Sequence, residues 1–262
     1  MSLTGKTPAS TYKDLLYVDN SNTGVDSTSR SVKSGNGTES SLLVSDRSLK
    51  VKSNTNNTTA LEVVNASDAE KFKVDTTNNQ VKALGHHVNT MYVNFGISNS
   101  ISNGWSAGRH FSVPFMGNNH SSTVQDDFNF GTGTDPATSF TTADGSNTDA
   151  SILTPVMWYI PDNISIDAVY SIEGADAATG DTTRMHLLSY DFTSGSTSAL
   201  TNGSILAHNN DVTNAGSEQA YLSTWTIDSA SVAANKVVLA FFVSDSINSD
   251  YSINITVKYH LT

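Results

Sequence analysis

A short apolar, polar, apolar unit recurs along the chain between Ser41 and Gly85. Its copies are Leu49-Lys50-Val51, Leu61-Glu62-Val63, Phe72-Lys73-Val74 and Val81-Lys82-Ala83, spaced 12, 11 and 9 residues apart. In an extended chain such a triplet places two apolar side chains on one face and one polar side chain on the other. The connectors between the triplets are rich in Asn, Asp, Ser and Thr, which turn the chain. The pattern therefore predicts a series of short β-strands.

These strands hold too few apolar side chains to build a core within one chain. Isolated short strand pairs are marginal in water, and periodic units need stacked neighbours to close a hydrophobic interior. We therefore expect three copies of the chain to intertwine over residues 41–90 as a homotrimeric β shaft. The predicted trimer-interface residues of the shaft are Leu49, Val51, Leu61, Val63, Phe72, Val74 and Val81.

Residues 1–40 contain few apolar side chains and consist otherwise mainly of Ser, Thr, Asn, Asp and Gly. We expect an extended attachment arm, with a disordered tail as the alternative, because chain ends are often poorly ordered. Only Thr11 to Val18, a short helix or strand, could dock with much buried area. The candidate attachment residues are Tyr12, Leu15, Leu16 and Tyr17.

After Gly85 the pattern changes to longer strands with alternating apolar positions. About nine such segments, separated by loops of Gly, Asn, Asp and Ser, indicate a β-sandwich or jelly roll over residues 91–262. A short helix is expected only at Asp228 to Asn235. The predicted strands are Met91 to Ile101, Arg109 to Met116, Val124 to Phe130, Leu153 to Ile160, Asn163 to Glu173, Arg184 to Phe192, Ala220 to Ile227, Lys236 to Val243 and Tyr251 to Leu261.

Two of these strands are candidates for a subunit interface in the C-terminal domain. Val237 to Val243 is apolar at every position, so it lies either in the middle of a sandwich or against another subunit, and we expect the latter. Tyr251 to Leu261 alternates strictly and has one apolar face. The predicted interface residues are Leu239, Phe241, Tyr251, Ile253, Ile255, Val257 and Tyr259.

Composition narrows the possible partners. The chain has 262 residues and a net charge of −11, which repels phosphate backbones and anionic lipid headgroups, so no nucleic-acid partner is expected. The absence of cysteine excludes disulfides and thiolate metal sites. No apolar run approaches the roughly 20 residues of a membrane span, and Met1 to Lys6 does not begin like a secretion signal. Neither membrane insertion nor a leader is therefore expected.

The N-terminal sequence resembles that of minor structural proteins and fibres of marine tailed bacteriophages. The similarity lies in Thr4 to Pro8, Thr11 to Leu16 and Val18 to Asp26, and the shaft-like segments Ser40 to Ser45 and Phe72 to Val81 continue it over roughly the first ninety residues. The resemblance implies a virion protein whose N-terminal end is fixed to capsid or tail proteins and whose outer end faces the host.

The C-terminal domain is similar in strand count to the trimeric jelly-roll heads of tumour-necrosis-factor and complement-C1q type. The expected architecture is thus all-β: an arm (1–40), a shaft (41–90) and a jelly-roll head (91–262). The expected function is a tail fibre or head fibre, with possible adhesion to a host-surface glycan. A carbohydrate-binding module, a capsid decoration protein without a receptor role and a polysaccharide depolymerase are the alternatives.

Few residues suggest chemistry. No nucleophile elbow, H-E-x-x-H motif or distinct pair of carboxylates occurs, so neither an enzyme nor a cofactor is expected. His86 and His87 are weak metal candidates, the alternative being ordinary polar residues at a hinge. Trp105 lies in a turn-like segment and could stack on a sugar, although packing against the sandwich or a neighbouring subunit is the expectation we favour.

Overall fold

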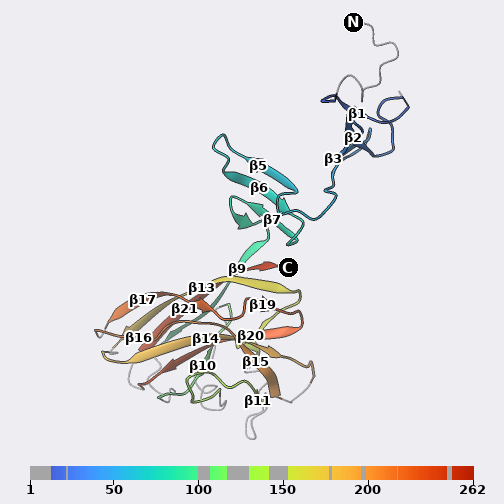
Figure 1. The fold of residues 1–262 in the computed structure, drawn as a ribbon. Helices are drawn as coiled ribbons and strands as arrows, with labels where there is room; N and C mark the ends of the chain where they lie inside the picture. The colour runs from blue at the N-terminus through green and yellow to red at the C-terminus, as the bar shows by residue number, and fades with distance from the viewer. Residues whose placement is uncertain are drawn as a thin grey trace. The chain divides into compact units, whose positions relative to one another are not determined.

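The computed structural model describes residues 13–21, 23–99, 107–116, 130–141, 153–176, 179–195, 199–216, 218–246 and 250–262. The chain divides into two compact units, Met1–Val88 and Asn89–Thr262 (Figure 1). In the described residues every regular element is a strand, except for one turn of 3₁₀ helix at Thr154–Val156. The prediction of an all-β chain is confirmed.

The first unit contains two four-stranded antiparallel sheets. Within each sheet, strands that are consecutive in the sequence lie side by side, as expected where short turns join successive strands. One sheet comprises β1 (Leu16–Val18), β2 (Arg30–Ser34), β3 (Glu39–Val44) and β4 (Leu49–Val51). The other comprises β5 (Leu61–Val64), β6 (Glu70–Asp75), β7 (Gln80–Ala83) and β8 (His86–His87).

The four predicted triplets are confirmed as strands, since each lies within one of β4 to β7. The turn chemistry is also as expected, because side chains of the connectors cap the turns. Asn65 Oδ1 accepts hydrogen bonds from the backbone of Ser67 and Ala69, and Asp75 Oδ1 accepts them from Thr77 and Asn78. The extended arm was expected to reach residue 40, but sheet structure begins earlier, at β1 and β2.

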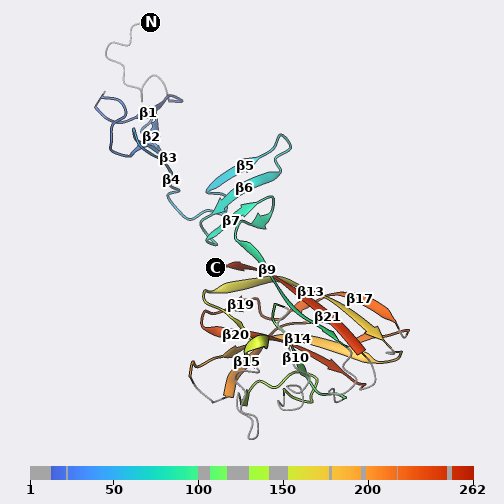
Figure 2. The same cartoon turned by 180° about the vertical axis from the view of Figure 1, so that it is seen from behind.

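The second unit is a sandwich of two antiparallel sheets (Figure 2). One sheet has five strands, in the order β17-β13-β21-β9 with β19 beside β13. The other has eight, in the order β10-β20-β14-β15-β11 with β12, β16 and β18 attached. The strands are β9 (Thr90–Asn99), β10 (Phe111–Val113), β11 (Phe140–Thr141), β12 (Trp158–Tyr159), β13 (Ile164–Asp176), β14 (Thr182–Asp191), β15 (Ala199–His208), β16 (Val212–Thr213), β17 (Gln219–Thr224), β18 (Thr226–Ile227), β19 (Ser231–Val232), β20 (Lys236–Ser244) and β21 (Asp250–Leu261).

The structure differs from the predicted elements of this unit in several places. The strand predicted at Leu153 to Ile160 is wrong over its first half, because Thr154–Val156 forms the turn of 3₁₀ helix and only Trp158–Tyr159 is a strand. The strand predicted at Ala220 to Ile227 is divided into β17 and β18, which belong to different sheets. β15 was not expected, because Asn202 and Gly203 interrupt its apolar pattern as a turn would. Gly203 is required there, since a Cβ atom would lie 2.6 Å from Tyr190 Cε1 and 2.8 Å from Thr138 Cα. The helix predicted at Asp228 to Asn235 is wrong, since Ser231–Val232 pairs with β13 as β19. Most of the predicted strand Val124 to Phe130 lies outside the described residues.

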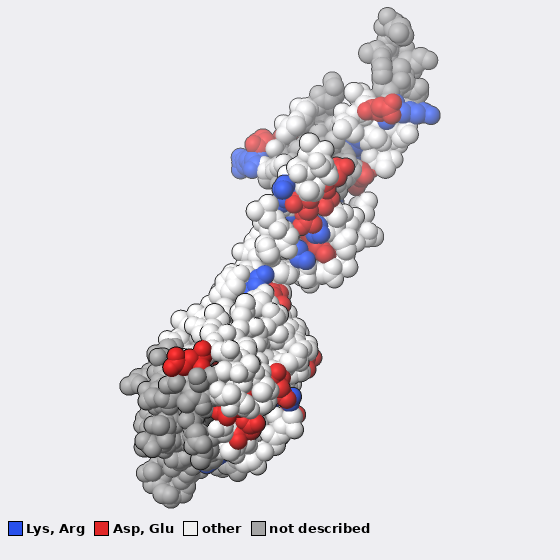
Figure 3. All heavy atoms as spheres, turned by 90° about the vertical axis from the view of Figure 1, so that its left-hand side faces the viewer, with Lys and Arg blue, Asp and Glu red and all other residues white. Residues whose placement is uncertain are grey.

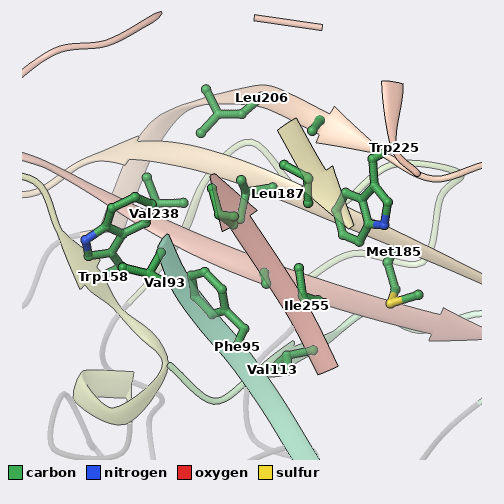
Figure 4. Packing of buried hydrophobic residues seen from close by; sticks show 14 of the residues in the cluster. Val93, Phe95, Val113, Trp158, Met185, Leu187, Leu206, Trp225, Val238 and Ile255 are labelled. Atoms are coloured by element: carbon green, nitrogen blue, oxygen red, sulfur yellow. The ribbon is translucent and has the colours of Figure 1, made fainter. Parts of the chain in front are cut away.

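The main hydrophobic core lies between the two sheets (Figure 4). Val93 and Phe95 of β9 meet Leu187 of β14 there, and Trp158 and Trp225 pack into the same cluster. Both tryptophans are buried there, as their positions inside the predicted strands Leu153 to Ile160 and Ala220 to Ile227 would allow.

β20 is buried on both faces by its own chain. Val238, Ala240 and Phe242 point into the main core, whereas Val237, Leu239 and Phe241 belong to a second cluster on the other side of the sheet. Phe130, Leu153 and Val156, from segments before β13, cover that second cluster. The interface prediction for Leu239 and Phe241 is therefore wrong, because both are fully buried within one chain.

The apolar face of β21 is also internal. Tyr251, Ile253, Ile255 and Val257 are buried in the main core, and Tyr259 packs against it. These five residues, predicted at a subunit interface, line the interior of the sandwich. The alternating pattern correctly predicted that one face of β21 is buried. That face packs against the opposite sheet of the same chain and not against another subunit.

We predict that Ile255→Ala lowers the free energy of unfolding of the second unit by about 2 to 5 kcal/mol, because it opens a cavity in the core. Asn254→Ala, on the exposed face of the same strand, is the matched control. Denaturant unfolding at two protein concentrations measures the free energy of unfolding of both variants. An Ile255→Ala protein whose free energy of unfolding equals that of the wild type would contradict the core assignment.

Candidate functional site

The sheet of β5 to β8 has one apolar face. Direct pairing across the strands creates two rows of side chains on that face, one running from Leu61 through Val74 to Val81 and the other from Val63 through Phe72 to Ala83. Residues paired in this way project to the same side of an antiparallel sheet.

The described residues leave this face incompletely covered, since its side chains are half-buried or exposed. Among the described residues of the first unit, no hydrophobic side chain is buried, and Val63 is 51% exposed. An apolar sheet face of this kind is stable in water only when something packs on it. It is therefore our candidate assembly surface.

The opposite face of the same sheet is charged. Glu62 is paired with Lys73, which is paired with Lys82, and Lys82 is paired in turn with His87. Lys73 also contacts Glu70 at 2.6 Å, and this hydrogen bond raises the pKa of Lys73. The sheet is amphipathic, with one charged face and one apolar face.

The sheet of β1 to β4 has a smaller apolar face made in the same way. Leu42 is paired with Val51, and Val44 with Leu49, so four apolar side chains share one side. Leu49 is 67% exposed and is covered by nothing in the described residues. All seven predicted shaft residues thus lie on apolar faces that a single chain leaves incompletely covered.

The candidate attachment residues lie at the edge of this first sheet. Leu15 and Leu16 are exposed and Tyr17 is half-buried, whereas Tyr12 lies outside the described residues. Nothing in the described part of the chain covers the two leucines.

His86 and His87 project to opposite faces of the second sheet, as adjacent strand residues must. His86 is paired with Ala83 on the apolar side, and His87 with Lys82 on the charged side. Their metal role stays a prediction, and the possible sugar contact at Trp105 lies outside the described residues.

The second unit has its own exposed apolar patch, on the outer face of the five-stranded sheet. Ile172 of β13 is paired with Leu222 of β17, with Tyr170 on the same face and Tyr92 on β9. All four are exposed, Leu222 to 75%. On the neighbouring strand β21, the residues that point to this outer face are Ser252, Asn254, Thr256 and Lys258, and none of them is a carboxylate.

This patch is distinctive because the second unit is strongly acidic. Residues 89–262 contain 4 Lys and Arg against 16 Asp and Glu, whereas residues 1–88 contain 10 against 9. In Figure 3, basic and acidic side chains are interspersed over the first unit, and acidic ones predominate on the visible face of the second. The repulsion that would oppose association of copies is thus absent from the first unit.

A line of three histidines occupies the outer side of the eight-stranded sheet. The rings of His110 and His186 are 5.4 Å apart, and those of His186 and His208 are 6.2 Å apart. His186 Nε2 lies 3.3 Å from Asp135 Oδ1, and His208 Nδ1 donates to Asp228 at 2.7 Å. Strand pairing places His186 opposite His208, whereas His110 precedes β10, so no spacing in the sequence indicates the cluster.

Two of these histidines, His110 and His186, are buried. Burial lowers the pKa of both His110 and His186. His110 donates a hydrogen bond through Nδ1 to the carbonyl of Gly131 at 3.1 Å. Together with the contact between His186 and Asp135, this bond links both ends of the segment 131–135 to the sheet. In the described part of the chain, the three rings do not bring three ligand atoms close enough together to share a metal ion.

A small apolar pocket opens at one end of the sandwich. Its volume is about 270 Å³, and its lining includes Trp158, Tyr259 and the exposed Asp162. Trp158 is only 7% exposed and stacks on Phe115, so it offers little ring surface to a ligand. Among the described residues, no helix is long and apolar enough to cross a membrane.

Comparison with known proteins identified no relative: no protein-family model and no curated protein matches the chain.

Glu173 of β13 is a buried carboxyl group that the sequence did not single out. It lies in the interior beside Thr183, whose hydroxyl is 2.8 Å from both carboxyl oxygens. Burial raises the pKa of Glu173 from 4.5 to about 7, which the Thr183 hydrogen bond only partly offsets. The folded state therefore holds this proton more tightly than the unfolded state.

We predict that stability falls as pH rises through this range. The contribution of Glu173 is fully present below about pH 4.5 and is lost by about pH 7, a loss of about 3 kcal/mol. Glu173→Gln removes the titration and flattens this part of the stability profile, whereas Glu218→Gln, at an exposed position, leaves it as in the wild type. Denaturant unfolding at several pH values measures this, and identical profiles for wild type and Glu173→Gln would contradict the assignment.

Proposed function

We propose that this protein is a subunit of a homotrimeric fibre of a bacteriophage virion. Its N-terminal end is held by capsid or tail proteins, the sheets of the first unit form an intertwined shaft, and the second unit is a projecting head. The observation that carries the proposal is the apolar face of β5 to β7, which the described part of a single chain leaves incompletely covered. Copies of the same chain would bury it.

The strand pairing of the second unit supports a jelly-roll head. When its two-residue strands are left out, eight described strands remain in the order β9, β10, β13, β14, β15, β17, β20 and β21. The first pairs with the eighth, the second with the seventh, the third with the sixth and the fourth with the fifth. One long hairpin folded over into two sheets would give this pairing, which supports the jelly-roll part of the proposal.

The outer face of the five-stranded sheet is the best candidate for contacts between heads. Tyr92, Tyr170, Ile172 and Leu222 are exposed there, on a sheet whose central outward positions are free of carboxylates although the unit carries 16. Burying these side chains between copies would remove apolar surface from water without bringing acidic groups together.

The virion assignment rests on the resemblance of the first ninety residues to phage fibres. A capsid decoration protein would use the same assembly without a receptor. Among the described residues, neither Trp158, which is nearly covered, nor Glu173, whose carboxyl group lies inside the sandwich, supports a carbohydrate-binding module or a depolymerase.

Two measurements test the proposal. Native mass spectrometry is expected to give about 84 kDa, three times the chain mass of 27.9 kDa. Immunogold labelling of virions, with antibodies against the full chain, is expected to mark the capsid or the tail. A trimer that is absent from purified particles would refute the virion assignment alone.

We predict that Val63→Asp dissociates the trimer, because it places a carboxylate on the face that the copies bury, while the half-exposed site tolerates it in a single chain. Lys82→Gln, on the opposite face of the same sheet, is the control and is expected to leave the mass unchanged. Native mass at equal concentration measures both. A Val63→Asp protein that stays at the trimer mass would contradict burial of this face.

A further inference from the structure

Two strands of the first unit lie at sheet edges and are fully exposed. β4 ends the order β1-β2-β3-β4, and β5 begins the order β5-β6-β7-β8. Among strands whose burial is described at every residue, β4 and β5 are the only ones in which every residue is exposed. In the described pairings neither has a neighbour on its outer side. Exposed apolar edge strands are templates for pairing with another chain.

The two edges match in sequence and oppose in charge. β4 is Leu49-Lys50-Val51, and β5 begins with Leu61-Glu62-Val63. Each therefore presents two apolar side chains toward the apolar side of its own sheet and one charge toward the other side. Opposite charges directly across a strand pair stabilise it, whereas like charges destabilise it, so β4 is suited to β5 and neither is suited to a second copy of itself.

We propose that β4 of one copy pairs edge to edge with β5 of the next copy, with Lys50 opposite Glu62. The central residue of one triplet faces the central residue of the other whichever way the two strands run. Because the two edges differ, the contact is head to tail, and three such contacts close a ring. This inference rests on the homotrimer proposed above and specifies how its shaft is joined.

The pairing would unite the two small sheets of neighbouring copies into one. The apolar face would then run without interruption from Leu42 and Val44 of β3, across both edge strands, to Val81 and Ala83 of β7. On the other face Glu62 would lie between Lys50 and its existing neighbour Lys73. Each joined sheet would thus present the continuous apolar side that its two parts lack separately.

Cysteine cross-linking tests this pairing directly, because the chain has no cysteine of its own. In Lys50→Cys/Glu62→Cys the two thiols face each other across the proposed contact. Oxidation is expected to convert most of the protein into a covalent trimer on a non-reducing denaturing gel, with loss of free thiol. Directly opposed strand residues lie within reach of a disulfide or a short bis-maleimide.

The controls separate the possible arrangements. Lys50→Cys alone is expected to give no covalent species, whereas a dimer from it would indicate β4 against β4. Lys50→Cys/Lys82→Cys, with the second thiol on an inner strand, is expected to remain uncrosslinked. A disulfide within one chain would overturn pairing between copies. A native trimer without the Lys50→Cys/Glu62→Cys link would overturn this pairing while leaving the trimer intact, and a wild type of single-chain mass would refute both.

Charge reversal provides a second measurement should the double-cysteine variant fail to assemble. Lys50→Glu and Glu62→Lys are each expected to raise the concentration at which the trimer dissociates by at least about fivefold, since each opposes like charges. The double reversal is expected to recover only part of the loss, because it restores the opposite charges between copies but Glu62→Lys still faces Lys73 of its own sheet. Additive losses in the double variant would overturn the pairing.

Discussion

The structure of the first unit depends on one constraint: strands with two apolar side chains each form a sheet whose apolar face the described part of the chain leaves incompletely covered. Cross-strand pairing gathers those side chains on one face of β5 to β7 and leaves no buried hydrophobic residue among the described part of residues 1–88. Hydrogen bonds and turn caps define the sheet, but they do not remove its apolar face from water. Assembly with other copies is the route that the proposed shaft uses.

The second unit meets the same requirement within a single chain. Its two sheets pack face to face, and segments before β13 cover the outer side of β20. Although β20 is apolar from Val237 to Val243, both of its faces are therefore buried by residues of the same chain. The charge distribution follows this division of roles. The acidic surplus lies in the unit that has its own core, and the unit that lacks one is nearly neutral. In the proposed fibre, the mutual repulsion of three acidic heads is tolerated because the joining surfaces carry little net charge.

The sequence allowed most strands to be predicted, because a period of two in hydrophobicity reports a half-buried strand directly. It did not reveal which surface covers an apolar face. Leu239 and Ile255 looked like interface residues, yet they are covered by other strands and loops of the same chain. β15 was missed since Asn202-Gly203 has the composition of a turn, although Gly203 is there to admit Tyr190 and Thr138. Glu173 and the line of histidines become visible only in the folded chain. The hydrogen bond between Glu173 and Thr183 joins two different sheets, and each of the three histidines comes from a different segment.

Hydrogen exchange of residues 41–85, compared between the trimer and the dissociated chain, tests the central claim most directly. The account predicts that backbone amides of β4 to β7 are protected in the trimer and lose that protection when dilution reduces the mass to 27.9 kDa, while those of β13, β20 and β21 remain protected. Unchanged protection of β4 to β7 in a single chain would show that these strands are stable alone and would contradict the account.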